Sequence, residues 1–239
     1  MQALIHIGTH KTGTTSFQNW AAASRSALAA GGVTWLQGRL GPSHAEVPLL
    51  AIDADRSLAM RAVHPDWCLP AWQADARADL RAQSEAAHER LLVSSEALSY
   101  ARRPREVERL AELFAPRELA VVAVLREPIS YLRSYRRTLI GMGFEPSRYQ
   151  GSFAYVEDDS WLLDYGAMLG AYREALGDDA VTVLDYEAEM ERRGSIIPAI
   201  LDGFGIGPGG LPAWDEFRDN RSRRGIGLRR RLRVVASGR

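Results

Sequence analysis

Lysine is almost absent from this chain of 239 residues. Lys11 is the only lysine, and arginine supplies all the other members of a set of 30 basic residues. A lysine ammonium is a compact point charge and a guanidinium is a planar fork, so arginine does not replace lysine where one cation must reach one oxygen. Lys11 is therefore a candidate functional residue. Usage poor in lysine and rich in alanine, arginine and glycine is also typical of a GC-rich bacterial genome.

Cysteine, net charge and long apolar runs are scarce as well. Cys68 is the only cysteine, which excludes a disulfide within the chain and a cysteine metal cluster. The 30 basic and 30 acidic residues balance, so no overall field attracts nucleic acid. No run approaches the roughly 18 apolar residues of a membrane span, and Met1 leads into a strand-like run rather than a signal peptide. These features predict a cytoplasmic protein with no nucleic-acid partner and no membrane span.

Short apolar runs alternate with segments of helical character. The strand-like runs are Ala3–Ile7, Gly32–Leu36, Arg90–Ser94, Leu119–Leu125 and Ala180–Leu184. The helical segments are approximately Thr14–Ala30, Trp72–Glu89, Pro104–Phe114, Pro128–Ile140, Trp161–Leu176 and Tyr186–Phe204. Apolar strands separated by helices predict a parallel sheet covered on both faces. We expect one α/β domain over residues 1–239, with three layers and helices on both faces of a parallel sheet.

Two segments, 37–70 and 141–159, lack a regular pattern. Long loops in a compact domain often form lids or the walls of a substrate site, although a solvated excursion explains either segment equally well. Aromatic side chains in or near them are able to stack on sugar rings or simply to join the core; these are Trp67, Trp72, Tyr155 and Trp161.

The segment from Gly8 to Ser16 is rich in glycine and hydroxyl side chains, and it joins a buried strand to a helix. Such a junction presents backbone N–H groups to a phosphate. Gly8 and Gly13 have the spacing of a nucleoside-triphosphate P-loop, but Thr14 stands where that motif has lysine, and Lys11 lies in the middle of the loop instead. The loop therefore predicts a phosphate site whose cation approaches from a different place. The alternative is a plain strand–helix turn with a chance lysine.

A second anion site is predicted at Arg126, because ligands of open parallel sheets bind at the carboxyl ends of strands. Ser134 lies about two turns into the following helix, from which its hydroxyl is able to meet the same phosphate. The alternative is an arginine that satisfies the helix start and a serine that faces solvent.

Together the two segments resemble the nucleotide-binding motifs of sulfotransferases that use 3′-phosphoadenylyl sulfate (PAPS). Lys11-Thr12-Gly13-Thr14-Thr15 resembles the loop that holds the 5′-phosphosulfate, and Arg126, Pro128, Ser134 and Tyr135 resemble the segment that holds the 3′-phosphate. The resemblance implies a P-loop NTPase-like sulfotransferase fold. It also implies a set of PAPS-binding residues: Lys11, Thr12, Gly13, Thr14, Thr15, Ser16, Arg126, Ser134 and, in a late basic loop, Arg223, Arg224 and Gly225.

In a sulfotransferase, the hydroxyl or amine that accepts the sulfuryl group must lose a proton, and two residues of this chain are candidates for the general base. Glu96 follows the strand-like run Arg90–Ser94, where it resembles the glutamate base of carbohydrate sulfotransferases; a helix-capping or surface glutamate is the alternative. His10 is the second candidate. It adjoins Lys11, whose like charge disfavours the imidazolium form.

The sequence thus predicts transfer of a sulfuryl group from PAPS to a hydroxyl, or to an amine, without a metal ion. A carbohydrate or another small metabolite is the favoured acceptor. Two other readings stay open. One is a P-loop small-molecule kinase that uses ATP and Mg²⁺, and the other is a non-enzymatic nucleotide-binding module whose arginine-rich tail contacts nucleic acid. The oligomeric state is not predicted.

Overall fold

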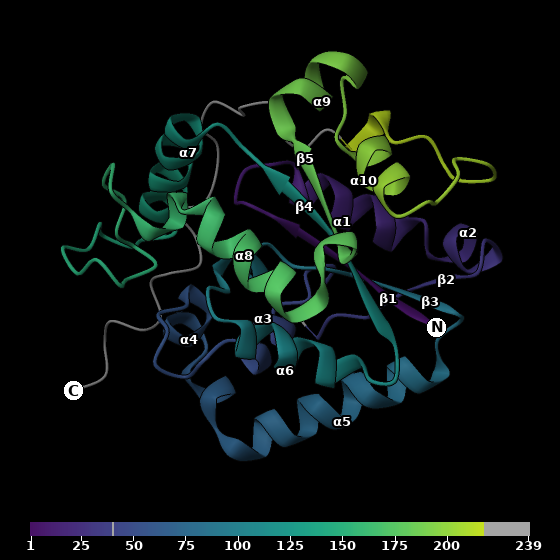
Figure 1. The fold of residues 1–239 in the computed structure, drawn as a ribbon, viewed down its shortest axis with the longest axis horizontal. Helices are drawn as coiled ribbons and strands as arrows, with labels where there is room; N and C mark the ends of the chain where they lie inside the picture. The colour runs from purple at the N-terminus through teal and green to yellow at the C-terminus, as the bar shows by residue number, and fades with distance from the viewer. Residues whose placement is uncertain (40, 218–239) are drawn as a thin grey trace.

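A parallel sheet of five strands forms the centre of the protein, as the computed structural model shows for residues 1–39 and 41–217. Its strands, in the spatial order β2-β3-β1-β4-β5, are β1 (Gln2–Gly8), β2 (Val33–Trp35), β3 (Arg90–Ser94), β4 (Glu118–Leu125) and β5 (Val181–Asp185). All four pairings are parallel. Figure 1 shows helices on both sides of this sheet, which confirms the predicted α/β fold with its three layers.

Alternating side chains divide the core between the two faces of the sheet. Ala3, Ile5 and Ile7 of β1 pack on one face, while Leu4 packs on the other. The first face is covered by α3 (Glu46–Ala51), α5 (Pro70–Ala86), α6 (Pro104–Phe114) and α8 (Tyr165–Leu176). The second is covered by α1 (Thr14–Ala23), α2 (Arg25–Ala30) and α10 (Ile197–Gly203). Residues on both faces of each inner strand are buried, which is why these strands read as nearly continuous apolar runs.

A third apolar cluster joins α7 (Pro128–Gly141) to the irregular segments of the chain. Tyr131, Tyr135 and Leu139 of α7 pack there with Phe153 and Leu162. Residues 142–160 form turns and bends without helix or strand. The cluster fixes this long loop against α7 and against Tyr100 of the 3₁₀ helix η2 (Glu96–Tyr100).

Three of the predicted helices are wrong in being continuous. The first is interrupted at Ser24, whose N–H is shared by the carbonyls of Trp20 and Ala21. Asp164 caps α8 at Ala167 N, so residues 161–163 form the separate 3₁₀ helix η3 (Trp161–Leu163). Gly194, with a φ of 68°, ends α9 (Tyr186–Arg193) before α10 begins. A left-handed glycine is a common helix stop.

The irregular segment 37–70 contains helices that the sequence did not predict. They are α3, α4 (Ala59–Val63) and the 3₁₀ helix η1 (Pro65–Cys68), and α5 begins at Pro70 rather than at Trp72. Every residue of α3 is buried. A helix of six residues has too few turns to show a periodic pattern, and tertiary packing rather than propensity stabilises it. Within the described part of the chain, no helix combines the length and the apolar character needed to cross a membrane.

Candidate active site

The loop of residues 9–13 lies at the carboxyl end of β1, between β3 and β4. The Thr9 N–H donates to the Val124 carbonyl of β4 over 2.9 Å, and the Ser95 N–H donates to the His6 carbonyl of β1 over 3.1 Å. The helix after β1 packs on one face of the sheet and α6, which follows β3, packs on the other. The carboxyl ends of β1 and β3 therefore form a topological switch point, the usual ligand position in such sheets.

Two residues of the loop have left-handed backbones. Gly13 has a φ of 77°, and Lys11, with a φ of 70°, is the one non-glycine residue with positive φ among those described. Positive φ in a non-glycine residue is uncommon and marks a constrained turn. The Thr12 hydroxyl, which is buried, donates to the Thr9 carbonyl over 2.7 Å and fixes the turn from inside. A Cβ on Gly8 would lie 2.5 Å from Thr12 Oγ1 and 2.8 Å from Thr14 Oγ1, so the close packing of the loop requires glycine there.

In the described part of the chain, the N-cap residue of α1 makes no side-chain hydrogen bond to the first turn of the helix. Gly13 is the N-cap and supplies no side-chain hydrogen bond, and the first turn carries no acidic residue. The first N–H groups of a helix have no partner inside the helix, and the helix dipole favours an anion at that end. Within the described residues, no carboxylate lies within ion-pair distance of the Lys11 ammonium. Loop, helix end and lysine together have the charge and the backbone donors that suit an anion.

A small hollow of about 110 Å³, here the loop hollow, opens beside Lys11. It brings the loop together with the residue that follows β3 by two positions and with a residue of α7. Its lining residues are His10, Lys11, Gly13, Thr14, Thr15, Glu96 and Thr138. The structure therefore places both predicted base candidates beside the predicted lysine.

Glu96 is held by two neighbours. Gln18 Nε2 donates to Glu96 Oε2 over 3.3 Å, and Glu96 Oε1 lies 4.0 Å from His10 Nδ1. The Gln18 amide also donates to the carbonyl and hydroxyl of Ser94 at the end of β3. Gln18 thus fixes one carboxylate oxygen of Glu96 against the sheet, and the other oxygen faces His10.

His10 is part of a chain of hydrogen bonds with two buried tyrosines. His10 Nε2 lies 2.8 Å from Tyr100 Oη, which lies 2.7 Å from Tyr135 Oη, and the imidazole stacks on the Tyr135 ring. Burial lowers the pKa of His10, the Glu96 charge opposes this, and the Lys11 charge adds to it. Burial raises the pKa of both phenols, so Tyr100 and Tyr135 stay protonated. His10 is therefore neutral at pH 7.

A larger cavity of about 220 Å³, here the apolar cavity, adjoins the loop hollow. The two share His10, Glu96 and Thr138. Most of its other lining residues are small or apolar. They come from both irregular segments, from α7 and from the residues that follow β3, and the full set is Ser43, Ala45, Ala59, Met60, Ser95, Ala97, Tyr100, Tyr135, Leu139 and Met142. Glu96 and His10 thus lie between the loop hollow and the apolar cavity.

Comparison with known proteins supports the fold. No protein-family profile matches the chain, and no curated protein matches it. A solved sulfotransferase from Alicyclobacillus acidocaldarius covers 90% of this chain and 85% of its own, with a TM-score of 0.56 and 14% sequence identity. The chain has a sulfotransferase-like fold. That agreement confirms the predicted resemblance at the level of the fold.

Two other solved structures superpose more loosely. A sulfotransferase domain from the curacin biosynthetic pathway covers 87% of this chain and 75% of its own, with a TM-score of 0.46 and 14% identity. A sugar kinase from Janibacter sp. HTCC2649 covers 89% of this chain and 99% of its own, with a TM-score of 0.34 and 13% identity. Superpositions this loose establish neither the fold nor the activity.

In this sulfotransferase-like fold, Arg126 lies at the end of β4 and contacts the loop directly. Its guanidinium donates to the Lys11 carbonyl over 2.8 Å and lies over the Tyr186 ring. Arg126 Nε lies 3.3 Å from Glu187 Oε1, so the two side chains form an ion pair. The Nε–H group does not point at that oxygen well enough to make a hydrogen bond. Arg126 therefore already has two roles in the protein, as a tether for the strained Lys11 backbone and as a partner of Glu187.

The remaining residues of the predicted PAPS-binding set differ in where they lie. Ser134 is partly buried on α7, where its carbonyl accepts from the Thr138 hydroxyl over 3.2 Å. Ser16 is partly buried in the first turn of α1, and Thr15 is exposed. Arg223, Arg224 and Gly225 lie outside the described residues. The nucleotide-binding role of all of these residues stays a prediction.

Sequence reasoning missed Gln18, Tyr100 and Thr138, which contact or line the candidate site. Thr138 carried a signal, since it lies one turn beyond Ser134 on the same face of α7. Gln18 and Tyr100 carried none, because only the folded sheet brings them to Glu96 and His10. Among the described residues, no group of three or more His, Cys, Asp or Glu side chains is arranged to hold a metal ion.

Proposed function

We propose that this protein is a sulfotransferase that moves a sulfuryl group from PAPS to a hydroxyl group of a small acceptor. One observation carries the proposal: the lone lysine, an uncapped helix N-terminus and a carboxylate line a single hollow, which adjoins a cavity of acceptor size. A sulfuryl transfer needs a cation where negative charge grows on the leaving phosphate and a base where the acceptor loses its proton. Lys11 and Glu96 supply these two groups.

The loop fits the 5′-phosphosulfate end of PAPS, which supplies the sulfuryl group when bound. Gly8 and Gly13 let the loop pack closely against its neighbours in the turn that a phosphate loop needs, since a Cβ on Gly13 would lie 2.9 Å from Ile196 Cγ2. Backbone N–H groups at the start of α1 are the donors expected to hold the anion. Lys11 would hold the oxygen on which charge develops, and Arg126 keeps the Lys11 backbone in its left-handed turn.

Glu96 is the stronger candidate for the base. If Tyr135 donates its proton to Tyr100 and Tyr100 donates to His10 Nε2, the one basic nitrogen of neutral His10 is occupied, and the other nitrogen, Nδ1, carries its proton toward Glu96. His10 then orients Glu96 rather than accepting the proton. One Glu96 oxygen is fixed by Gln18, and the Glu96 side chain is 29% exposed, so an acceptor is able to reach it.

The apolar cavity favours a small acceptor over a large one. A volume of about 220 Å³ holds roughly one sugar ring or a comparable metabolite. An acceptor hydroxyl at its mouth would meet Glu96, and an amine would meet the same carboxylate.

Isothermal titration separates this function from the alternatives. We expect adenosine 3′,5′-bisphosphate to bind much more tightly than 5′-AMP, and ATP with Mg²⁺ to bind weakly. Transfer from labelled PAPS to a panel of sugars, phenols and amines should then persist in the presence of EDTA, as expected for a reaction without a metal. Tighter binding of ATP·Mg²⁺ than of the bisphosphate would favour the kinase instead, and an absence of all transfer with tight bisphosphate binding would favour a non-enzymatic nucleotide-binding module.

A further inference from the structure

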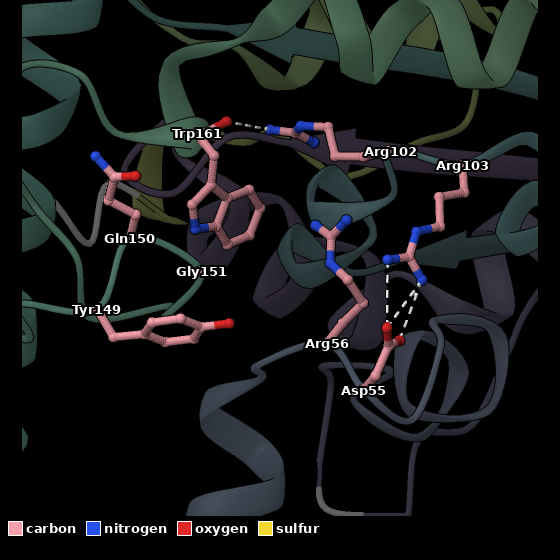
Figure 2. A pocket seen from close by; sticks show the side chains of 8 residues that line it. All are labelled: Asp55, Arg56, Arg102, Arg103, Tyr149, Gln150, Gly151 and Trp161. Carbon is pink, nitrogen blue, oxygen red and sulfur yellow. Dashed lines mark hydrogen bonds and ion pairs between the residues drawn. The ribbon is translucent and has the colours of Figure 1, made fainter.

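Another hollow, of about 390 Å³, is lined in part by Arg56 and Trp161, which both contact Tyr100. We call it the arginine hollow, and it is lined by Asp55, Arg56, Arg102, Arg103, Tyr149, Gln150, Gly151 and Trp161 (Figure 2). The guanidinium carbons of Arg56 and Arg102 lie 4.9 Å and 5.1 Å from the centre of the Trp161 ring. Two cations thus share one indole at the edge of an open hollow.

Neither of these guanidinium groups has a carboxylate within ion-pair distance in the described part of the chain. Arg102 donates to the backbone carbonyls of Ser99, Ala101 and Trp161, and its buried Nε has no partner. Arg56 donates one hydrogen bond, to the Tyr100 carbonyl over 2.9 Å. Most donors of Arg56 therefore remain available to a ligand. Burial lowers the pKa of Arg102 to about 10, with the Arg56 charge adding to the effect, so both groups are charged at pH 7.

The carboxylates nearest to Arg56 are already engaged by other donors. Asp53 accepts from Arg103, Arg105 and Arg109. Asp55 pairs with Arg103 in the view of Figure 2, with its two oxygens within 3.3 Å of that guanidinium. The buried Glu106 accepts the backbone N–H groups of Asp53, Arg102 and Arg103. Two like charges held together without their own counterions favour an external anion, because it offsets both their repulsion and their desolvation.

An aromatic wall completes the arginine hollow. Tyr149 is 73% exposed, and its hydroxyl points toward Arg56 across the hollow (Figure 2). The ring lies over Gly151, where a Cβ would come within 2.9 Å of it. Glycine at this position thus lets the ring lie flat on the loop. An exposed aromatic face beside cations is suited to a sugar ring that carries an anionic group.

The arginine hollow is connected to the active site through Tyr100. The Tyr100 carbonyl accepts from Arg56, its ring packs edge-on against Trp161 at 5.3 Å, and its hydroxyl bonds His10. Asp55 and Arg56 line the arginine hollow, and Ala59 and Met60 of the same segment line the apolar cavity.

We propose that the arginine hollow is an acceptor subsite for an anionic sugar residue, with Arg56 and Arg102 binding its carboxylate or sulfate group. The proposal rests on the proposed function, and it means that the acceptor is a small acidic saccharide rather than a neutral metabolite.

The subsite is tested by direct binding, without PAPS or turnover. Glucuronate, glucose 6-sulfate and glucose are titrated into the full chain while the indole N–H signal of Trp161 is followed by heteronuclear NMR. We expect at least one of the two anionic sugars to bind and to move this signal, and glucose to leave it unchanged. Binding of glucuronate alone identifies a carboxylate ligand, and binding of glucose 6-sulfate alone identifies a sulfated one. If glucose moves the signal as strongly as both acids, or if no sugar moves it, the proposal is wrong.

Matched variants locate the binding. Arg56→Gln should weaken the acidic sugar by roughly tenfold or more, since it removes a charge-assisted contact. Arg81→Gln makes the same change of charge on exposed α5 and should have no effect. Gly151→Ala should displace the Tyr149 ring and weaken binding a few-fold while leaving thermal stability unchanged.

Lys11→Ala should leave sugar binding intact, and a loss in that variant would place the anion in the loop and overturn the subsite. Bisphosphate titration of Arg56→Gln should give wild-type affinity, which keeps a failure of the subsite separate from a failure of the sulfotransferase assignment.

Discussion

At the loop after β1, positive charge comes from one lysine and from backbone N–H groups, whereas at the arginine hollow it comes from two guanidinium groups stacked on an indole. The loop backbone is closely constrained: Lys11 and Gly13 have left-handed backbones, and Thr12 is buried and bonded. The arginine hollow has an exposed wall at Tyr149.

The difference between these two sources of positive charge fits the role that we propose for each site. A point charge on a fixed backbone is suited to charge that develops at one atom during a reaction, because little must rearrange as the charge grows. Planar guanidinium groups are suited to holding a stable carboxylate or sulfate through paired hydrogen bonds. We therefore expect substitutions in the loop hollow to change the rate of transfer, and substitutions in the arginine hollow to change acceptor affinity.

The largest expected effect is that of Glu96→Gln. The substitution keeps the shape and the bond from Gln18 but removes the base, so kcat should fall by about 10²–10⁴ while bisphosphate affinity stays within twofold or so. Transfer is measured with labelled PAPS and the best acceptor of the panel. His10→Gln is the matched comparison and should cost less. If His10→Gln abolishes transfer while Glu96→Gln retains it, the base is His10.

Lys11→Ala should lower kcat by about 10²–10³, as removal of an oxyanion donor does in other enzymes, with a smaller loss of nucleotide affinity. Lys11→Arg should not restore the rate, because a planar fork does not reproduce the point charge. Steady-state kinetics of the two variants with the same acceptor makes the test. Wild-type turnover of the arginine variant would remove the distinction between the two kinds of cationic site.

Arg126→Ala should weaken bisphosphate by about 1.5–3 kcal/mol, the value of a hydrogen bond to a charged group, and leave 5′-AMP nearly unaffected. Because Arg126 also tethers the Lys11 carbonyl, kcat should fall as well. Glu187→Gln is the control: it frees Arg126 from its carboxylate partner and should leave bisphosphate affinity equal or higher. Equal losses for both nucleotides would show that Arg126 acts only on the loop.

The smallest effect concerns stability in acid and the buried His44, which accepts from the Ser94 N–H at the end of β3 and donates to the Leu36 carbonyl, both over 2.8 Å. Burial lowers the pKa of His44 to about 4, although the Leu36 bond opposes this. Between pH 4 and 6.5 the unfolded chain thus binds a proton that the folded protein does not, so stability rises with pH across this window and is lost as pH falls. From pH 7 to pH 5 the loss should be about 2 kcal/mol.

Urea unfolding at the two pH values measures this loss. His44→Gln keeps a donor and an acceptor but does not titrate, so its stability should change less with pH by that amount. The buried His6, whose pKa burial lowers to about 3, keeps part of the acid sensitivity in both proteins. Identical pH dependence of the wild type and His44→Gln would rule out His44 as a source.

Much of the scaffold was readable along the chain. All five strands and the exact span of α6 follow from local patterns, because buried parallel strands are short apolar runs and Pro104 marks a helix start. The helix breaks at Ser24 and Gly194 and the buried α3 were not predicted, since capping geometry and packing decide them. The base candidate Glu96 came from its position after a strand and from its resemblance to the glutamate base of carbohydrate sulfotransferases, and the structure places it and the second candidate, His10, beside Lys11.

The sequence by itself determined the layered α/β fold, the glycine–threonine loop and the importance of the only lysine, because these depend on neighbours within about ten positions. Only the tertiary structure decided how Glu96 is held, which ring nitrogen of His10 faces it, and that Arg56 and Arg102 share the indole of Trp161. Those arrangements join residues that are 46 to 105 positions apart in the chain (Arg56 to Arg102, and Arg56 to Trp161). No local pattern encodes such contacts, because they arise when the crossing connections of the sheet bring separate loops to one edge.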